Sequence, residues 1–550
     1  MNKWFKSGSP WIWMTGGAVS LSLIAVLGLL LLIAWRGLTY FWPGTVFQWE
    51  IQHEGGEVHR VIGELYDTEE VPVTRLRESG LNLEGINDET LERYLIKTGN
   101  RELVSLDFRW ELQSDIISRT APEGIAVFER IKNGNFYGYP KALLENGQPV
   151  VTDNFEQELQ ARIERVLEIS DRANSLQKSE IGAVNWELEQ LRLEERGLEL
   201  EGKLTPAKVA EFEAKRQQLN ADYAVLEKEL FALRDEAARD KVIVVDMEGN
   251  DITLKMDSIL GVMYSNRLSV LDKMGAWLHG VSNFITSDPR EANTEGGVFP
   301  AIFGTIFMVL LMAVIVTPFG VVAAIYLHEY AKKGAVTKMI RIAVINLAGV
   351  PSIVYGVFGL GFFVYMVGGS IDDLFYPEAA PAPMFGSPGV LWSALTLAIL
   401  TLPVVIVSTE EGLSRIPSSV RQGSLALGAT KAETLLRIVI PMASPAIMTG
   451  LILAVARAAG EVAPLMLVGV VKLAPNLPLD GNFPYIHLER KFMHLGFHIY
   501  DVGFQSPNVE AARPLVYATS FLLVSVIVAL NLTAISVRNR LREKYRSLEH

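Results

Sequence analysis

The sequence of 550 residues contains no cysteine, which excludes a disulfide scaffold and catalysis by a thiol. It also lacks a loop of the form Gly-x4-Gly-Lys-Ser/Thr, the type that cradles nucleotide phosphates. Gly423 and Gly428 have the required separation, but Ala429 and Thr430 follow them, so the lysine is missing. We therefore expect a chain that is not an enzyme, hydrolyses no ATP and binds no cofactor itself. No basic patch studded with aromatic residues is present, so nucleic acid is not an expected partner.

Six long apolar segments have almost no charge, and each is long enough to cross a bilayer. They comprise residues 11–35, 299–327, 342–367, 389–408, 446–470 and 514–537. The first has no small-residue cleavage site after it, so we predict an uncleaved N-terminal anchor over 1–35 rather than a signal peptide. The predicted fold class is an all-α polytopic membrane protein with six transmembrane helices, in contact with membrane lipid.

The distribution of lysine and arginine predicts the orientation of these spans. If the N-terminus is cytoplasmic, the inner segments contain fifteen basic residues: Lys3, Lys6, Lys332, Lys333, Lys338, Arg341, Arg415, Arg421, Lys431, Arg437, Arg538, Arg540, Arg542, Lys544 and Arg546. The two short outer loops, 368–388 and 471–513, contain only Lys472, Arg490, Lys491 and Arg513. We therefore expect both termini, including the tail 541–550, in the cytoplasm of a bacterial cell. Residues 36–298 should then lie on the periplasmic side of the inner membrane.

Residues 36–298 form an acidic insertion with a formal net charge of −18, whereas the rest of the chain carries +6. Over 46–152, short alternating runs predict a β-rich lobe with hairpin turns at Asn133-Gly134 and Asn146-Gly147. The return segment 240–298 should contain a β-hairpin and an amphipathic segment at 258–286. Because a domain of this charge repels small anions, we do not expect it to capture one.

Residues 155–239 predict an antiparallel coiled-coil hairpin. Apolar residues recur at steps of three and four in two runs: Ile181, Val184, Leu188, Leu191 and Leu198, then Phe212, Leu219, Tyr223, Leu226, Leu230 and Leu233. Between the runs, Gly202 should end one helix, and Thr205 and Pro206 should begin the next. Such a hairpin is either a sensor or docking arm, or a stabilising appendage or spacer.

Residues 409–445 form a cytoplasmic loop that is too polar to span a membrane and too apolar for a plain linker. Thr430 should cap a short helix through Leu436, and Pro441 and Pro445 should end the next helical segment. Short helices bracketed in this way are suited to docking into a groove on a partner. Gly428 is followed, after nine residues, by Ile438-Val439-Ile440-Pro441.

This spacing resembles the coupling loop of ABC-importer permeases, in which E-A-A, three residues and Gly precede, after nine residues, Ile-x-Leu-Pro. Here Ile440 replaces the leucine, and Gln422-Gly423-Ser424 replace E-A-A, so the carboxylate at the head of the motif is missing. Other segments between about 299 and 540 resemble permeases of phosphate-specific transporters. They are IYLHEYA (325–331), INLAGVPSIVYGVFGLG (345–361), LALGATKAETLLRIVIP (425–441) and ARAAGEVAPL (456–465), and the ending of the last favours the A type over the C type.

The resemblance implies the ABC-importer permease fold over 299–540, transport of inorganic phosphate, and coupling to an ATPase through the loop 409–445. The implied coupling residues are Gln422, Gly423, Ser424, Gly428, Ala429, Thr430, Ile438 and Pro441. The implied partners are a second permease of the C type, a dimer of ATP-binding subunits that holds ATP and Mg, and a periplasmic phosphate-binding protein.

Arg457 and Glu461 are the only charged residues in the six predicted spans. Intramembrane charges usually face a protein interior or a water path, and the i, i+4 spacing predicts one helix face for both. Because an arginine offers a fixed charge and a planar donor fork that suits an oxyanion, this pair is our candidate for the substrate path. The alternative is a self-neutralising pair that packs the helix against a partner subunit.

Gly349-Val350-Pro351 interrupts the third predicted span, and Gly356, Gly359 and Gly361 follow. This pattern is typical of a broken helix that lines a transport path. It is equally typical of close helix packing through small residues, and the sequence leaves both open.

His487, His494 and His498 lie in the last outer loop, with Glu489 and Asp501 as further potential metal ligands. The surrounding sequence 485–500 instead favours an amphipathic helix at the membrane interface, so we expect no metal.

Three other functions remain open on the sequence. A similar frame could carry molybdate, sulfate or an amino acid. A membrane-anchored periplasmic sensor, or an ion-coupled secondary carrier, would share some of these features.

Overall fold

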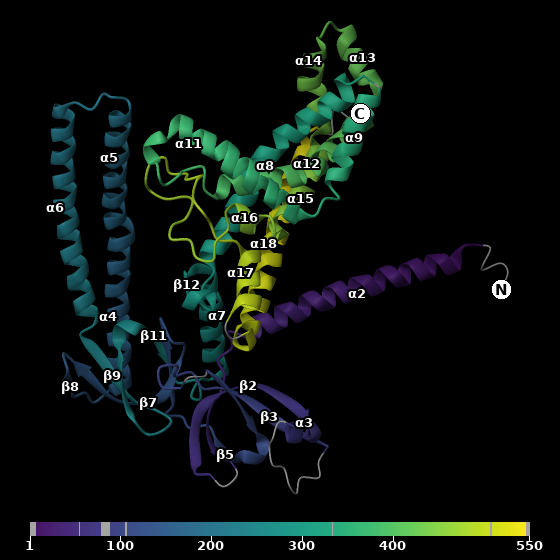
Figure 1. Cartoon of the computed structure of the whole chain (residues 1–550). Coiled ribbons are helices and arrows are strands. Elements are labelled where there is room, and N and C mark those ends of the chain that lie inside the picture. The colour runs from purple at the N-terminus through teal and green to yellow at the C-terminus, as the bar shows by residue number, and fades with distance from the viewer. Residues whose placement is uncertain are drawn as a thin grey trace. The chain divides into compact units, whose positions relative to one another are not determined.

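The computed structural model describes residues 7–53, 56–78, 89–104, 107–332, 334–506 and 509–545. Several positions used to predict the orientation, namely Lys3, Lys6, Lys333 and Arg546, lie outside the described residues, as do the last residues of the tail. The chain divides into two compact units, one formed by Met1–Tyr40 with Phe284–His550 and the other by Phe41–Asn283 (Figure 1).

The first unit is helical, and within the described ranges six helices are long and apolar enough to cross a membrane, as predicted. Five of them are built on α2 (Ser9–Thr39), α8 (Phe299–Ile325), α12 (Val390–Arg415), α15 (Ile440–Gly460) and α18 (Val509–Tyr545). The sixth joins α10 (Ser352–Phe358), the π-helical segment η6 (Gly359–Gly368) and α11 (Gly369–Phe375). The mainly helical membrane frame is therefore confirmed.

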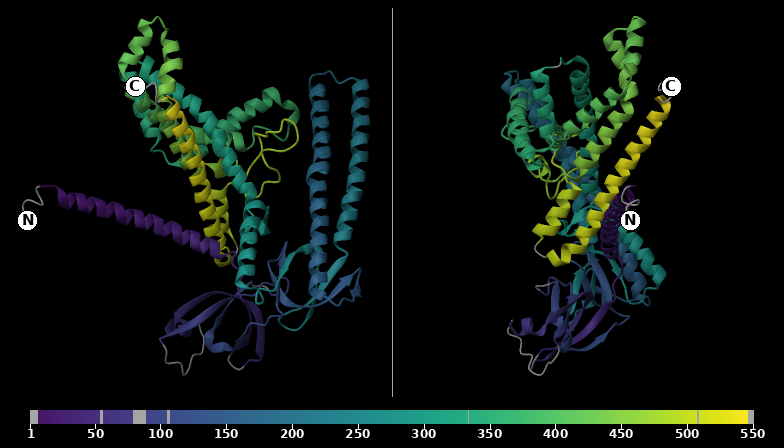
Figure 2. Two further views of the ribbon diagram at one scale, coloured as in Figure 1. Left: turned by 180° about the vertical axis from the view of Figure 1, so that it is seen from behind. Right: turned by 90° about the vertical axis from the view of Figure 1, so that its right-hand side faces the viewer.

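α12 forms the centre of this unit, because it packs against α8 and against α15. Figure 2 shows the long helices of this unit from two further sides. Two glycines allow the helices to approach closely. A Cβ at Gly320 of α8 would lie 2.5 Å from the Val405 side chain, and one at Gly412 would lie 2.4 Å from Ala446 of α15. Small residues at such crossings are the usual means by which membrane helices pack.

The third span begins later than the predicted position at 342–367, and the predicted interruption at Gly349-Val350-Pro351 lies before it. α9 (Ala335–Leu347) ends before Gly349-Val350-Pro351, and α10 begins only at Ser352. A residue before proline is disfavoured in the α conformation, and Pro351 itself has the extended backbone of a helix N-cap. α9 is therefore a separate helix with no buried residue.

The fifth span is also displaced from its predicted position at 446–470. α15 begins at Ile440 and ends at Gly460, and after a turn only α16 (Leu465–Val468) is helical. The prediction that Pro441 and Pro445 end a helical segment is wrong, because both lie within α15. Pro441 lies in the first turn of α15, where no backbone donor is needed, and its carbonyl, which Pro445 cannot bond, accepts from Ser444 Oγ at 2.7 Å.

The outer loop between α15 and α18 is folded into the helical unit rather than forming the predicted interfacial helix over 485–500. Only α17 (Leu495–Tyr500) is helical there, followed by the π-turn η9 (Asp501–Gln505). Phe492 is fully buried, and the backbone N–H of Leu495 donates to Thr305 Oγ1 of α8 at 2.9 Å. Backbone hydrogen bonds from Val390 and Leu391 tie the start of α12 to the same loop.

The second unit contains the predicted β-rich domain, arranged as two antiparallel sheets. The first has the order β4-β3-β2-β1-β5, and the second has the order β10-β9-β7-β6-β11, with β8 paired to β7. The strands are β1 (Val46–Gln52), β2 (Val58–Pro72), β3 (Thr90–Lys97), β4 (Phe108–Leu112), β5 (Ile116–Thr120), β6 (Ala126–Arg130), β7 (Phe136–Glu145), β8 (Gln148–Val150), β9 (Asp240–Val245), β10 (Asp251–Lys255) and β11 (Ile259–Met263).

The predicted turns at Asn133-Gly134 and Asn146-Gly147 are present, and all four residues have positive φ. The second sheet also takes its strands β9, β10 and β11 from the return segment, so the β structure is not confined to 46–152. The predicted amphipathic segment at 258–286 is helical only in α7 (Val270–Thr286), because its first part forms β11.

Residues 155–237 form a helical hairpin within this unit. One arm consists of α4 (Phe155–Ser175), the π-turn η2 (Leu176–Ile181) and α5 (Gly182–Leu200), and the other is α6 (Pro206–Ala237) (Figure 1). Gly202 has a φ of 67°, and Thr205 caps α6 by accepting from the Lys208 N–H at 3.4 Å, as predicted. Whether the arms supercoil as a coiled coil stays a prediction.

Candidate functional site

Two breaks in the membrane helices lie next to each other. One follows α9 at 348–351, and the other follows α15 at 461–464. A Cβ at Gly356 of α10 would lie 2.7 Å from the Cα of Pro464, so only glycine allows this contact. The Leu347 carbonyl at the end of α9 accepts from the Tyr355 hydroxyl at 2.6 Å and from the Val350 N–H at 3.2 Å, which ties α10 to the end of α9.

Arg457 and Glu461 lie beside these breaks. Arg457 is in the last turn of α15, and Glu461 caps the end of this helix with an extended ψ of 130°. The helix ends at Gly460, and the chain then turns toward Pro464. As the i, i+4 spacing predicts, the two side chains form an ion pair, with 3.7 Å between Arg457 Nε and Glu461 Oε1.

The pair is only partly covered by this chain. Arg457 retains 33% and Glu461 22% of side-chain exposure, whereas Ala454, Ala458 and Ala459 on the neighbouring face of α15 are fully buried. About a third of the Arg457 side chain is therefore not covered by this chain.

The glycine-rich third span has features of both predicted structures, the broken helix and the close packing through small residues. The helix break at 349–351 is present, and Gly356 and Gly359 make close contacts. A Cβ at Gly359 would lie 2.3 Å from Thr396 Oγ1 of α12. A Cβ at Gly361 would meet nothing within 4 Å, so packing does not require a glycine there.

The predicted coupling residues form a helix–turn–helix at one end of the helical unit. α12 extends to Arg415, so the first part of the predicted loop 409–445 belongs to this helix. α13 (Ser418–Ala426) and α14 (Lys431–Thr434) follow, and the π-turn η8 (Leu435–Val439) leads directly into α15. Gln422 and Gly423 are exposed on α13, and Ile438 and Pro441 lie on the continuous helical path beyond α14.

Local geometry fixes the turn between α13 and α14. Gly428 has a φ of 89°, which favours glycine. Thr430 caps α14 as predicted: its hydroxyl accepts from the Glu433 N–H, and Glu433 accepts from the Thr430 N–H. Ser424, which replaces an alanine of the family motif, is buried, and its hydroxyl pairs with that of Thr434 at 2.8 Å.

A set of polar residues that the sequence did not reveal joins these helices to the end of α8. They lie on the π-turn η5 (Tyr326–Tyr330), which continues α8, and on α13 and α14. Arg421 donates to Glu329 from Nε at 3.1 Å, and Lys431 donates to the Glu329 carbonyl. The only signals were that Glu329 lies in the segment IYLHEYA and that Arg421 directly precedes Gln422.

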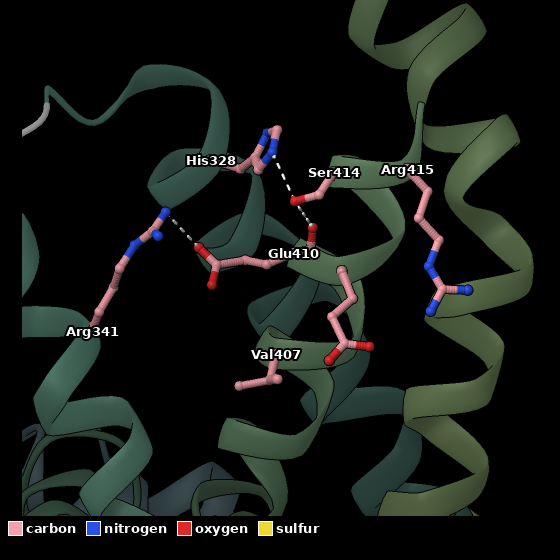
Figure 3. Close-up of a pocket in the computed structure, with 7 residues that line it drawn as sticks. His328, Arg341, Val407, Glu410, Ser414 and Arg415 are labelled. Carbon is pink, nitrogen blue, oxygen red and sulfur yellow. Dashed lines mark hydrogen bonds and ion pairs between the residues drawn. The ribbon is translucent and has the colours of Figure 1, made fainter. Parts of the chain in front are cut away.

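A pocket of about 410 Å³ lies next to this set, lined by His328, Arg341, Val407, Glu410, Glu411, Ser414 and Arg415 (Figure 3). Arg341 of α9 forms an ion pair with Glu410 of α12 at 3.1 Å, and His328 bonds Ser414 at 3.2 Å (Figure 3). Both acidic and basic side chains line the pocket, so its charge favours neither an anionic nor a cationic ligand. Its contacts tie α9 and η5 to α12.

The three histidines of the outer loop do not converge. His487 lies between Asp480 and Glu489, at 3.0 and 3.1 Å, while His494 accepts from the Gly496 N–H at 3.1 Å. Within the described ranges, no three His, Asp or Glu side chains are grouped in a way that could hold a metal ion. Burial lowers the pKa of both His494 and His498 to about 4.

Comparison with known proteins identifies the helical unit. Residues 316–547 match the family model described as binding-protein-dependent transport system inner membrane component. The phosphate transport system permease protein PstA 1 of Mycobacterium tuberculosis H37Rv is 31% identical over 284 residues, which cover 51% of this chain and 80% of that protein. The probable ABC transporter permease protein YqgI of Bacillus subtilis is 30% identical over 260 residues, which cover 46% of this chain and 82% of that protein.

Among solved structures, the methionine ABC transporter MetNI in an inward-facing conformation matches with 15% identity and a TM-score of 0.33. The match covers 44% of this chain and 94% of that chain, and at this TM-score it carries no argument. PstA 1, in two strains of Mycobacterium tuberculosis, and YqgI are at least 30% identical to this chain and are covered over about four fifths of their length. The chain therefore belongs to the family of binding-protein-dependent transport system inner membrane components, among its permeases of the PstA type.

Proposed function

We propose that this chain is a membrane-spanning permease subunit of an ABC importer for inorganic phosphate. The observation that carries the proposal is the position of Arg457, a cation in an apolar span, partly exposed and next to two helix breaks. A charge at the bilayer centre costs at least about 2.5–3.5 kcal/mol, so it is normally retained for a function. Relatives named as phosphate permeases support the choice of cargo.

In this proposal, Arg457 compensates part of the cost of bringing a phosphate anion out of water, a cost of several kcal/mol per ion. Glu461 holds the guanidinium in place when the path is empty and competes with the anion for it. The helix breaks supply free backbone groups beside the path, as in other transporters whose spans are interrupted at the binding site.

The proposed assembly contains a second permease of the C type, a dimer of ATP-binding subunits and a periplasmic phosphate-binding protein. ATP and Mg bind to the ATP-binding subunits. The exposed helix–turn–helix of α13 and α14 docks into them, with Leu425 and Leu427 as apolar contacts, which are 47% and 91% exposed. A methanocaldococcal protein named as a probable PstC is 31% identical over 67% of its length, which is consistent with a pair of similar permeases.

Both termini and the α13–α14 tip are proposed to lie in the cytoplasm of a bacterial cell, and residues 36–298 in the periplasm. The hairpin 155–239 is proposed to be an antiparallel coiled coil. The insertion 36–298, of which the hairpin is part, suits an appendage or docking arm rather than a phosphate site, because its net charge of −18 repels anions.

Uptake of labelled phosphate by the assembled complex in proteoliposomes tests this function. Phosphate should accumulate only with ATP and the binding protein, and excess molybdate, sulfate or amino acid should not compete. Competition by one of these solutes would show that the importer transports that solute rather than phosphate alone. Uptake without ATP would favour a secondary carrier, and absence of any uptake would favour a sensor.

A further inference from the structure

The polar set at the end of α8 forms a clamp, which we define as Glu329, Tyr330, Arg421 and Lys431. Arg421 Nη2 lies 3.0 Å from Glu329 Oε1, in addition to the bond from Nε, so one carboxylate oxygen receives two guanidinium contacts. Glu329 is 11% and Arg421 20% exposed, so the pair is largely shielded from solvent. Charge-assisted bonds in such surroundings are stronger and more directional than surface ion pairs.

The same guanidinium also reaches the end of α12. Its Nη1 donates to the Ile416 carbonyl at 2.8 Å, and its Nη2 donates to the Leu413 carbonyl at 2.7 Å. Arg421 thus joins three elements, namely α13, the last turn of α12 and η5. The planar donor fork of arginine is needed for this, and a lysine could not make these bonds together.

Lys431 makes the second connection, from the start of α14. Its ammonium group donates to the Glu329 carbonyl and lies 4.2 Å from the centre of the Tyr330 ring. Because Ser424 and Thr434 bond α13 to α14 at 2.8 Å, the two short helices and η5 are held as one body.

We propose that the clamp transmits the motion of the coupling helices to α8 and α12, with Glu329 as the positioning residue that closes it. This inference rests on the proposed function, because it requires an ATPase that moves α13 and α14. Coupling between distant sites needs an element that moves as a unit. Without the Glu329 carboxylate, the α13–α14 tip would still dock on the ATPase, but only Lys431 would join it to η5, so α8 would follow its motion less closely.

The test compares Glu329→Gln with the matched control Glu411→Gln, an exposed carboxylate of α12 outside the clamp. In the reconstituted complex, both the ATPase rate and the phosphate uptake are measured. For Glu329→Gln we expect the number of phosphate ions moved per ATP to fall at least about tenfold while the ATPase partner co-purifies. The control should keep the wild-type ratio. A wild-type ratio in Glu329→Gln would overturn the clamp.

A covalent replacement of the ion pair distinguishes transmission from a merely structural role. The chain has no cysteine, so the double variant Glu329→Cys/Arg421→Cys carries the only two thiols. It should be uncoupled when reduced, and a flexible bifunctional thiol reagent about as long as the ion pair should restore at least half of the coupling ratio. A cross-linked complex that stays uncoupled would contradict the proposal. A wild-type complex that hydrolyses ATP but moves no phosphate would instead contradict the proposed transport of phosphate and leave the clamp proposal unaffected.

Discussion

Arg457, the residue proposed to line the phosphate path, lies in the last turn of α15. A cation there interacts favourably with the negative end of the helix dipole. That interaction is worth less than about 1 kcal/mol at most sites, whereas the cost of an intramembrane charge is several times larger. The dipole therefore does not explain why an arginine is retained there.

Neutralising the pair in two steps separates the path from packing. Arg457→Gln should reduce phosphate uptake at least about a hundredfold at matched membrane levels, and Arg457→Lys should keep the charge but lose the donor fork. If Arg457 lines the path, the double variant Arg457→Gln/Glu461→Gln stays inactive, because no cation remains to meet the anion. Full recovery of labelled phosphate uptake in the double variant would show that the pair only packs.

His498 is a second residue whose environment has a measurable consequence. It is 2% exposed, and neither ring nitrogen has a hydrogen-bond partner among the described residues. Its pKa of about 4 lies below the ordinary 6.5 because burial disfavours the charged ring, and the positive Lys472 adds to this while Asp501 opposes it. The neutral ring therefore behaves as a buried apolar group.

The folded outer loop should lose stability as the pH falls from 6.5 toward 4. Above 6.5 His498 is neutral in the folded and the open loop, but below 6.5 only the open loop takes up the proton. A shift of this size corresponds to about 3 kcal/mol. Hydrogen exchange of residues 485–505 should therefore accelerate in this pH window, and His498→Leu should remove about half of the dependence, because His494 in the same loop has a similarly lowered pKa. The exposed His59→Leu is the control, and an unchanged slope in His498→Leu would contradict the assignment.

At the scale of elements, the helical hairpin has a base and a tip with different roles. Near the base, Leu159, Ile163 and Val166 of α4 are buried together with strand residues of the second sheet. Toward the tip, Leu191, Phe212 and Leu219 contact only residues of the hairpin itself. Removing the whole of 155–239 would therefore expose the core of the sheet, whereas removing the tip would not.

Deleting 185–219 and joining the ends by a short glycine-serine link should leave the β domain and the membrane unit folded. By contrast, Leu159→Ala should destabilise the β domain by about 2–5 kcal/mol through loss of buried apolar contacts. Limited proteolysis of the full chain and its thermal unfolding measure both effects. Early proteolysis of the β domain in the deletion variant would show that the tip is part of its structure.

At the scale of the whole molecule, the two units differ in the solvent for which their surfaces are suited. The helical unit carries exposed apolar residues along α2, such as Ile24 and Leu31, at 68% and 69%, which only a lipid environment or a partner would cover. The other unit has a charged surface rich in ion pairs along its hairpin. This contrast supports the proposed topology, with the insertion in water outside the membrane.

Single cysteines in the cysteine-free chain test the topology directly. Val225→Cys on α6 and Leu427→Cys on the coupling tip are highly exposed positions, at 67% and 91% in the native chain. In spheroplasts that produce this chain without the ATP-binding subunits, which would cover Leu427, a membrane-impermeant thiol reagent should label the first within minutes and the second only after permeabilisation. The reverse pattern would invert the proposed orientation.

The sequence by itself determined the six apolar spans, the β-rich insertion, the hairpin turns and the Thr430 cap. These depend on local properties, namely apolar length, residues that accept positive φ, and a side chain that bonds its own backbone. The family also followed from local motifs around Gly428 and Pro441.

Only the tertiary structure decided where the helices end and what the polar residues contact. Pro445 continues a helix because Ser444 bonds the Pro441 carbonyl, and α15 ends at Gly460 although the apolar sequence continues to 470. The Glu329–Arg421 contact joins residues 92 positions apart. No periodicity reveals such a pair, because packing of distant segments brings the charges together.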